Sequence, residues 1–181
     1  MLSLMTERLL LRSWQESDSA DLYEYAKSEW VGPFAGWKPH QNEAESKEII
    51  KRFIEADDTY AIVLKDENKV IGGIGLHHRF PDESLQHLNQ REIGYVLNPN
   101  YWGRGIVPEA VTCLLDHGFH HLGLDLIWCA HYDFNAKSKR VIEKCGFNYQ
   151  FTKQKTLHLL DDQEVNTLYY HLSKQGYLNR K

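Results

Sequence analysis

The residue types best suited to chemistry lie in a glycine-rich stretch, Tyr101 to Ala110, between a strand-like segment and a long amphipathic one. Gly103 and Gly105 have no side chain, so backbone N–H groups can approach an anion closely there. A helix that starts directly after them adds unpaired amides and the positive end of its dipole. The stretch therefore predicts a phosphate-binding site at a helix start, and an ordinary tight turn is the alternative.

Two common phosphate-binding loops do not match this stretch. A Walker loop needs Lys and then Ser or Thr directly after its last glycine, whereas Ile106 and Val107 follow Gly105. The dinucleotide-binding fingerprint needs a third glycine where Pro108 stands, and no regular alternation of strands and helices precedes it. The sequence thus disfavours a nucleotide triphosphatase and a Rossmann dehydrogenase.

The composition is that of a protein with one hydrophobic core. The chain has 181 residues, of which 42% are hydrophobic and 25% charged, so we expect a single domain over residues 1–181. Its formal net charge of −4 argues against binding to nucleic acid. There is no apolar run near membrane-spanning length and no leader pattern at Met1. We therefore expect a cytoplasmic protein with neither a nucleic-acid nor a membrane partner.

The cysteines and histidines do not predict a metal site. The three cysteines are scattered within apolar segments, which is typical of reduced core thiols. His117, His120 and His121 have helical spacing that suits an adventitious nickel or zinc ion. We expect no native metal.

Hydrophobic periodicity predicts an α/β (α+β) order of elements. The expected strands cover residues 8–14, 59–65, 70–78, 90–97, 126–130, 147–156 and 164–173, and the expected helices cover 17–27, 42–57, 107–119 and 135–145. The segment Trp30 to Gln41 fits neither pattern, because it combines large aromatic side chains with glycines and prolines. It is either a lid over a site or packing that covers the core.

Several short patterns together resemble the GCN5-related N-acetyltransferase (GNAT) superfamily, and within it the branch of ribosomal-protein N-terminal acetyltransferases. The patterns are Thr6 to Arg12, Glu92 to Leu97 followed by Pro99, Trp102 to Ala110, Asn135-x-x-Ser138, and Glu143 to Phe147. The resemblance runs nearly end to end. It implies a central mixed, mostly antiparallel twisted sheet of about seven strands with about four flanking helices. The central strands of that fold splay apart to admit acetyl-CoA.

The resemblance also implies that the glycine-rich turn binds the pyrophosphate of CoA. Trp102 stands where the family often has Gln or Arg, Gly105 matches its central glycine, and Val107 replaces a small residue. In the family, main-chain N–H groups bind the pyrophosphate. The departures are therefore tolerable if the Val107 side chain points away from the phosphates. Pro108 has no N–H and ends the row of donors. The expected CoA contacts are Leu97, Trp102, Gly103, Arg104, Gly105, Ile106, Val107, Asn135 and Ser138.

The implied reaction is acetyl transfer from acetyl-CoA to a primary amine by direct attack in a ternary complex. The enzyme must deprotonate an ammonium, stabilise an oxyanion and assist a departing thiolate. Glu92 is the expected base, because the family often has a catalytic or water-ordering glutamate at this place. His77 or His78 is the alternative. Successive strand side chains face opposite ways, so at most one of the two histidines points into the cleft.

The leaving thiolate needs a different group. Many members of the superfamily use a tyrosine at the position that is Ile142 here, so the usual acid is absent. Ser138 is the expected hydrogen-bond donor to the sulfur, with a plain helix-start serine as the alternative. Asn135 either holds the pantetheine or simply caps the helix.

The acceptor amine stays open. A protein N-terminus, such as that of a ribosomal protein, and a small polyamine, amino acid or aminoglycoside are all compatible, as is a non-catalytic acyl-CoA-binding or regulatory module. We expect the acceptor pocket between the segment Trp30 to Gln41 and the turn at Asp161 and Asp162, whose carboxylates, with Glu164, suit a polycation unless they are a solvated tip. A monomer or a homodimer is compatible with the sequence.

Overall fold

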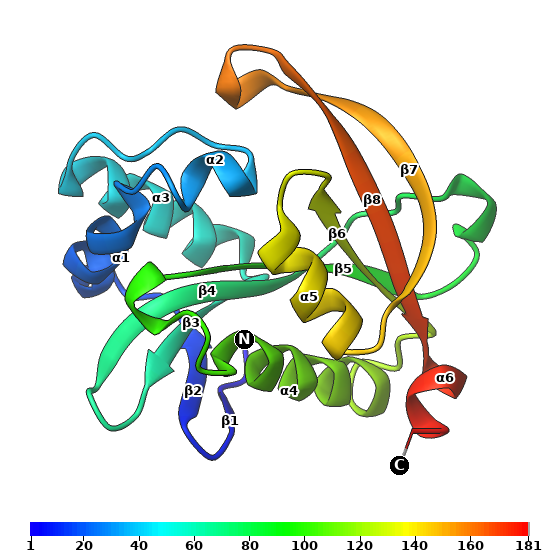
Figure 1. Cartoon of the computed structure of the whole chain (residues 1–181). Coiled ribbons are helices and arrows are strands. Elements are labelled where there is room, and N and C mark those ends of the chain that lie inside the picture. Colours follow the sequence, from blue (N-terminus) through cyan, green and yellow to red (C-terminus); the bar gives the residue numbers. More distant parts are fainter. Residues whose placement is uncertain (181) are drawn as a thin grey trace.

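One eight-stranded sheet, in the order β1-β2-β3-β4-β5-β6-β8-β7, organises the protein (Figure 1). The computed structural model describes residues 1–180. The strands are β1 Leu4–Met5, β2 Leu9–Ser13, β3 Thr59–Leu64, β4 Lys69–His77, β5 Gln90–Leu97, β6 Leu126–Tyr132, β7 Asn148–Leu157 and β8 Gln163–Ser173. The helices are α1 Ser19–Ala26, α2 Gly32–Ala35, α3 Glu43–Ala56, α4 Ile106–His120, α5 Ala136–Lys144 and α6 Lys174–Leu178.

The mixed, mostly antiparallel sheet expected from the sequence is confirmed, and every expected strand and helix is present. Three elements were not expected: β1, α2 and α6, which have two, four and five residues. Elements this short do not complete enough of a hydrophobic period to be recognised in a sequence.

Helices cover both faces of the sheet because the strands alternate their apolar side chains. Ile62 and Ile74 point to the face where α4 packs, and they share a core with Leu114 of that helix. Val63 and Val70 point to the opposite face and share a second core with α1 and α3. None of the helices within residues 1–180 is long and apolar enough to span a bilayer.

The sheet splits between β5 and β6, its only parallel pair in the described chain. These strands pair only over Gln90–Ile93 and Leu126–Cys129. Beyond that point β5 continues beside β4 as far as Leu97, and β6 continues beside β8 as far as Tyr132. The splay expected from the family resemblance is therefore present, and the inner edges of both strands carry backbone groups without a strand partner.

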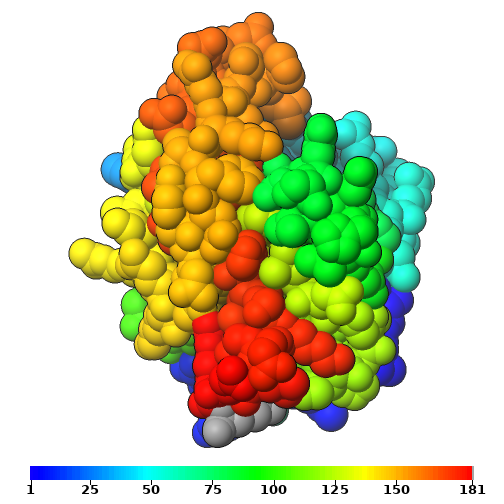
Figure 2. Space-filling model, turned by 90° about the vertical axis from the view of Figure 1, so that its right-hand side faces the viewer, coloured from blue at the N-terminus to red at the C-terminus, as the bar shows by residue number. Residues whose placement is uncertain are grey.

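The β7–β8 hairpin forms an arm that projects beyond the rest of the molecule (Figure 1; orange in Figure 2). At its tip Asp161 and Asp162 adopt positive φ angles of 54° and 58°, which aspartate tolerates better than most residues. On the face shown in Figure 2 the segment before β5 lies against the arm, where Lys153 Nζ donates to the Pro81 carbonyl over 2.5 Å.

The thiols lie where the sequence placed them, inside the apolar elements. Cys129 and Cys145 are buried and Cys113 is half-buried, and all three are free. Burial raises the pKa of Cys145 to about 11, so this thiol stays protonated at neutral pH.

Candidate active site

The glycine-rich stretch forms a tight turn between β5 and α4. Asn98 accepts a hydrogen bond from the Asn100 amide over 3.0 Å and starts a short 3-10 turn. Gly103 and Gly105 follow with φ angles of +76° and +72°, a left-handed conformation that favours glycine. Helix α4 begins at Ile106, directly after the second glycine. The turn thus points the start of a 15-residue helix toward the C-terminal end of β5.

Five successive amides in this turn, Gly103 to Val107, have no acceptor within residues 1–180. The flanking amides do have one: Trp102 donates to the Pro99 carbonyl and Glu109 to the Gly105 carbonyl, both over 3.2 Å. Pro108, which has no N–H, ends the row. Free amides at a helix N-terminus form a binding site for an anion, so the chain fits a pyrophosphate here.

The cations beside the turn are fixed by other groups. Arg104 donates to the Asn100 carbonyl over 2.8 Å, and its guanidinium lies 5.0 Å from the centre of the Tyr101 ring. Arg8 is a residue that the sequence analysis missed. It donates to the Arg104 carbonyl over 2.9 Å and forms an ion pair with Glu109 at 2.6 Å, which ties the start of β2 to the first turn of α4. Two basic side chains therefore border the row of amides.

Trp102 and Val107, the two departures from the family pattern, serve the packing. The Trp102 indole donates to the Leu97 carbonyl over 3.0 Å, and Lys137 Nζ lies 3.6 Å from the centre of its ring. The Val107 side chain is buried in the core beneath α4 and therefore points away from the amides. Both departures leave the main-chain donors accessible.

Helix α5 borders the splay and positions a pair of hydroxyl groups. Asn135 is the N-cap of α5, since its Oδ1 accepts from the Ser138 amide over 3.1 Å, and its Nδ2 donates to the Phe34 carbonyl over 3.2 Å. Ser138 Oγ lies 2.8 Å from the hydroxyl of Tyr95 on β5. Burial raises the pKa of Tyr95 well above its usual range, so this phenol remains protonated.

Tyr95 lies within the pattern Glu92 to Leu97, and a role for its hydroxyl was not expected. The available signal was the alternation of side chains along β5, which places Tyr95 on the opposite face from Glu92 and toward α5. Ile142, at the family's usual tyrosine position, is 1% exposed and belongs to the core. The hydroxyl near the splay therefore comes from a strand instead of a helix.

A cavity of about 690 Å³ reaches through the splay. Tyr95, Asn135 and Ser138 line it on the α5 side, and Glu92 and His77 line it on the side of α1 and α3. The remaining walls come from β6, β7, β8 and the segment after α1. One continuous space thus joins the hydroxyl pair to the candidate bases.

Glu92 and His77 are register partners on β5 and β4, so their side chains lie on the same face of the sheet. Glu92 is 12% exposed and lies 3.6 Å from the guanidinium of Arg79. The backbone of Gly94 leaves room for the His77 ring, since a Cβ there would come within 3.2 Å of its Nε2. His78 follows the strand, is exposed and does not line the cavity. Of the two histidines, only His77 faces the cleft.

Asp58 orients His77. Asp58 Oδ2 lies 2.8 Å from His77 Nδ1, and the same carboxylate accepts a 2.8 Å hydrogen bond from Thr59 Oγ1. Burial raises the pKa of Asp58, but the hydrogen bonds from His77 and Thr59 outweigh it and hold the pKa below its usual value. An ionised Asp58 fixes the Nδ1–H tautomer of His77, which leaves Nε2 as an acceptor on the cavity side.

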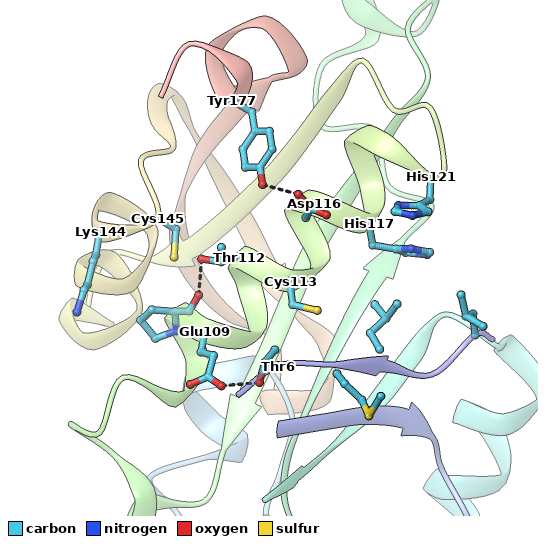
Figure 3. A pocket seen from close by; sticks show the side chains of 14 residues that line it. Thr6, Glu109, Thr112, Cys113, Asp116, His117, His121, Lys144, Cys145 and Tyr177 are labelled. Atoms are coloured by element: carbon cyan, nitrogen blue, oxygen red, sulfur yellow. Dashed lines mark hydrogen bonds between the residues drawn. The ribbon is translucent and has the colours of Figure 1, made fainter. Parts of the chain in front are cut away.

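A second cavity, of about 750 Å³, lies beside α4 and holds none of the expected site residues (Figure 3). Its carboxylates have partners: Glu109 accepts from Thr6, and Asp116 accepts from Tyr177 over 3.1 Å. His117 and His121 stack with ring centres 5.5 Å apart. No cluster of three metal-ligating side chains occurs in the described part of the chain.

The acidic residues at the tip of the arm do not line the acceptor side of the cavity. Asp161 pairs with Lys38 at 2.5 Å, Asp162 pairs with His158 at 2.8 Å, and Glu164 accepts from Gln154 over 2.8 Å. All three carboxylates thus have partners within the described chain, which favours the solvated tip over a polycation site.

Comparisons with known proteins agree with this geometry. The family model of the acetyltransferase (GNAT) domain matches residues 8–148. The uncharacterised N-acetyltransferase YnaD of Bacillus subtilis is 29% identical over 143 residues, which cover 79% of this chain and 81% of that protein. The crystal structure of a GNAT-family acetyltransferase from Bacillus anthracis superposes with a TM-score of 0.83 at 24% identity and covers 96% of this chain and 99% of that one.

The ribosomal-protein-S5-alanine acetyltransferase of Vibrio fischeri has the same fold, with a TM-score of 0.73 at 22% identity over 96% of this chain and 97% of that one. The splayed sheet and the match to the domain model define an acyltransferase. The chain belongs to the GNAT acetyltransferase family. Members of this family use acetyl-CoA as co-substrate, and the non-catalytic module is set aside.

Proposed function

We propose that the protein transfers the acetyl group of acetyl-CoA to a primary amine by direct attack in a ternary complex. One observation carries the proposal: a single cavity passes through the splay and has Glu92 and His77 on one side of the sheet and Tyr95 and Ser138 on the other. A thioester placed in the splay meets a base and a proton donor from opposite faces.

In this proposal the main chain holds the CoA end. The amides of Gly103, Arg104, Gly105, Ile106 and Val107 donate to the pyrophosphate, and Arg8 and Arg104 supply positive charge nearby. The amide groups of the pantetheine pair with the free inner edges of β5 and β6. Three of the expected contacts hold the surrounding structure in place and do not bind CoA directly. The Leu97 carbonyl accepts a hydrogen bond from the Trp102 indole, and Asn135 caps α5.

On the other face a base removes a proton from the ammonium of the acceptor. Glu92 accepts this proton directly or through water, and His77 Nε2, oriented by Asp58, is the second candidate. The amine nitrogen then attacks the thioester carbonyl carbon, and the carbon–sulfur bond breaks as the tetrahedral intermediate collapses. The products are the acetylated amine and CoA.

The departing sulfur is proposed to receive a hydrogen bond from Ser138, backed by the protonated Tyr95. A thiol has a pKa not far above neutrality, so its thiolate is a good leaving group and needs little help. A serine–tyrosine pair is therefore sufficient in place of the tyrosine that Ile142 replaces.

The proposal also covers the class of acceptor amine, the cellular location and the oligomeric state. The shared fold with ribosomal-protein acetyltransferases supports a protein N-terminus, and the cavity volume of about 690 Å³ supports a small amine. The net charge of −4 supports action without a nucleic-acid partner, and we place the enzyme in the cytoplasm as a monomer or homodimer without a membrane partner.

The test is binding followed by turnover. Acetyl-CoA should bind in calorimetry and raise the melting temperature, because a ligand that binds only the folded state stabilises it. Release of free thiol from acetyl-CoA should then depend on an added amine. Absence of binding would refute the CoA site, and binding with no thiol release across peptide, amino acid and polyamine acceptors would refute the transferase.

A further inference from the structure

The acceptor side of the cavity is covered by the segment that follows α1. Phe34 accepts a hydrogen bond from Asn135 over 3.2 Å, and its ring packs edge-on against Phe134 at 5.5 Å. Lys38 forms an ion pair with Asp161 at the tip of the β7–β8 arm, with a separation of 2.5 Å. The segment therefore joins α5 to the arm across the cavity, so it is a cover and not only core packing.

Gly36 shows how close this cover lies to β6. A Cβ at this position would come within 2.5 Å of the Tyr132 hydroxyl, and the φ angle of +92° favours glycine in any case. The whole cavity, from Tyr95 and Ser138 to Glu92 and His77, has a volume of about 690 Å³, which lies in the range of small-molecule sites.

Hydrogen-bond donors dominate the polar lining of this space. Its two carboxylates already have partners: Glu92 lies beside Arg79, and Glu45 accepts from the Gln41 amide over 2.7 Å. Thr167 is 3% exposed, and its hydroxyl has no hydrogen-bond partner within residues 1–180. The same holds for the indole N–H of Trp14, which is 3% exposed. Both of these atoms are buried from solvent, so the donors that a ligand can reach are the exposed ones of the lining, such as Lys155.

Lys155 lines the side of the cavity that holds Glu92 and His77, and it has no carboxylate partner within residues 1–180. Within residues 1–180 no acidic oxygen lies within 4.0 Å of it, and its Nζ lies 5.7 Å from the centre of the Tyr169 ring. Burial lowers the pKa of Lys155, but the Tyr169 hydroxyl and the Glu92 carboxylate outweigh it and raise the pKa, so the side chain stays charged. Thr167 is in register with Tyr132 on the neighbouring strand, and both line the cavity with Lys155.

We infer that the acceptor is a small amino acid, with its amine at Glu92 and His77 and its carboxylate at Lys155. This inference rests on the proposed function and narrows it. A zwitterion matches the two ends of the site, because its ammonium meets the base and its carboxylate meets the ammonium of Lys155. A polyamine would place a second positive charge against Lys155.

The experiment compares matched acceptors that differ only in the carboxylate. Free L-amino acids, the corresponding amino acid amides and tetrapeptides with the same first residue are assayed by thiol release from acetyl-CoA. The free acids should exceed their amides in kcat/KM by about 10-fold or more, since one charged hydrogen-bonded contact is lost in the amide. Equal rates for acid and amide, or faster acetylation of the tetrapeptides, would overturn the inference.

Variants locate the carboxylate. Lys155→Met should reduce the preference for the acid to about 2-fold or less through KM, with the rate on the amide unchanged. Lys153→Met is the matched control, since Lys153 lies on the same strand but bonds to the Pro81 carbonyl outside the cavity. Arg52→Met tests the exposed cation on α3. Loss of the preference in this last variant, and not in Lys155→Met, would refute the role of Lys155.

A binding measurement separates this inference from the proposed function. N-acetylated amino acids should raise the melting temperature more than N-acetylated amino acid amides, and Lys155→Met should abolish the difference. Equal shifts would refute the amino acid site. If these shifts appear as expected while no amine gives thiol release, the transferase proposal fails and the amino acid site stands.

Discussion

The chemistry depends on which side chain on the cavity side of β4 and β5 takes the proton. Glu92 and His77 are both placed for it, and they differ in their neighbours: Glu92 lies beside Arg79, whereas His77 is held by Asp58. Both side chains can accept a proton from an ammonium, so separate substitution of each one identifies the base.

With Glu92 as the base, Glu92→Gln should lower kcat by about 10²- to 10⁴-fold, because general-base assistance is worth that much. The dissociation constant for acetyl-CoA, measured by calorimetry, should stay within about 2-fold, since the proposed CoA contacts lie at the turn before α4. His77→Gln is the comparison variant. If Glu92→Gln keeps its rate at every pH and His77→Gln loses it, the base is His77.

At the leaving group, Tyr95→Phe removes the hydroxyl that contacts Ser138 and leaves the ring in place. Because a thiolate leaves readily, we expect only about a 3- to 30-fold fall in kcat, with no change in acetyl-CoA affinity. Steady-state thiol-release kinetics measure both. A loss as large as that of the base variant would mean that Tyr95 has a more direct part in the chemistry.

At the scale of elements, the turn before α4 owes its binding capacity to backbone conformation. Gly105→Val forces a β-branched residue into φ +72°, which costs roughly 1–2 kcal/mol and displaces the neighbouring amides. Arg104→Ala removes a side chain that already contacts Asn100 and Tyr101. Calorimetry with CoA should therefore show a larger loss of affinity for Gly105→Val than for Arg104→Ala, and the reverse ranking would count against main-chain recognition.

The sequence predicts elements well where they are long and periodic. β5 was expected over residues 90–97 and occupies Gln90–Leu97, and the glycine-rich turn lies between this strand and α4 as expected. Contacts between distant segments leave no periodic signal. The pairing of Arg8 with Glu109, the Tyr95–Ser138 contact and the cover formed by Phe34 to Lys38 arise only when the chain folds.

For the whole molecule, buried histidines predict the response to acid. Burial lowers the pKa of His40 and His171 below the usual 6.5. Below pH 6.5 the unfolded chain therefore binds more protons than the folded chain. The stability that these histidines contribute is fully present above pH 6.5, and it is lost as the pH falls toward their pKa values in the folded protein. The melting temperature should drop between pH 7 and pH 5.

His40→Gln should weaken this drop, since His40 lies 8% exposed beside Ser46 and its neutral ring accounts for part of the effect. His87→Gln is the control at an exposed histidine and should keep the wild-type slope. Calorimetric scans at pH 7.5, 6 and 5 measure both. A difference of about 1 kcal/mol corresponds to roughly 2–4 °C for a chain of this size.

The split between β5 and β6 also has a kinetic consequence. In the proposed function, CoA binds at the turn before α4 and the amine meets Glu92 and His77 on the side of α1 and α3, so each substrate has its own route to the gap between β5 and β6. Neither substrate then needs to bind first, and either product can leave while the other remains. Product inhibition should follow this division, with CoA competing only against acetyl-CoA and the acetylated product competing only against the free amine.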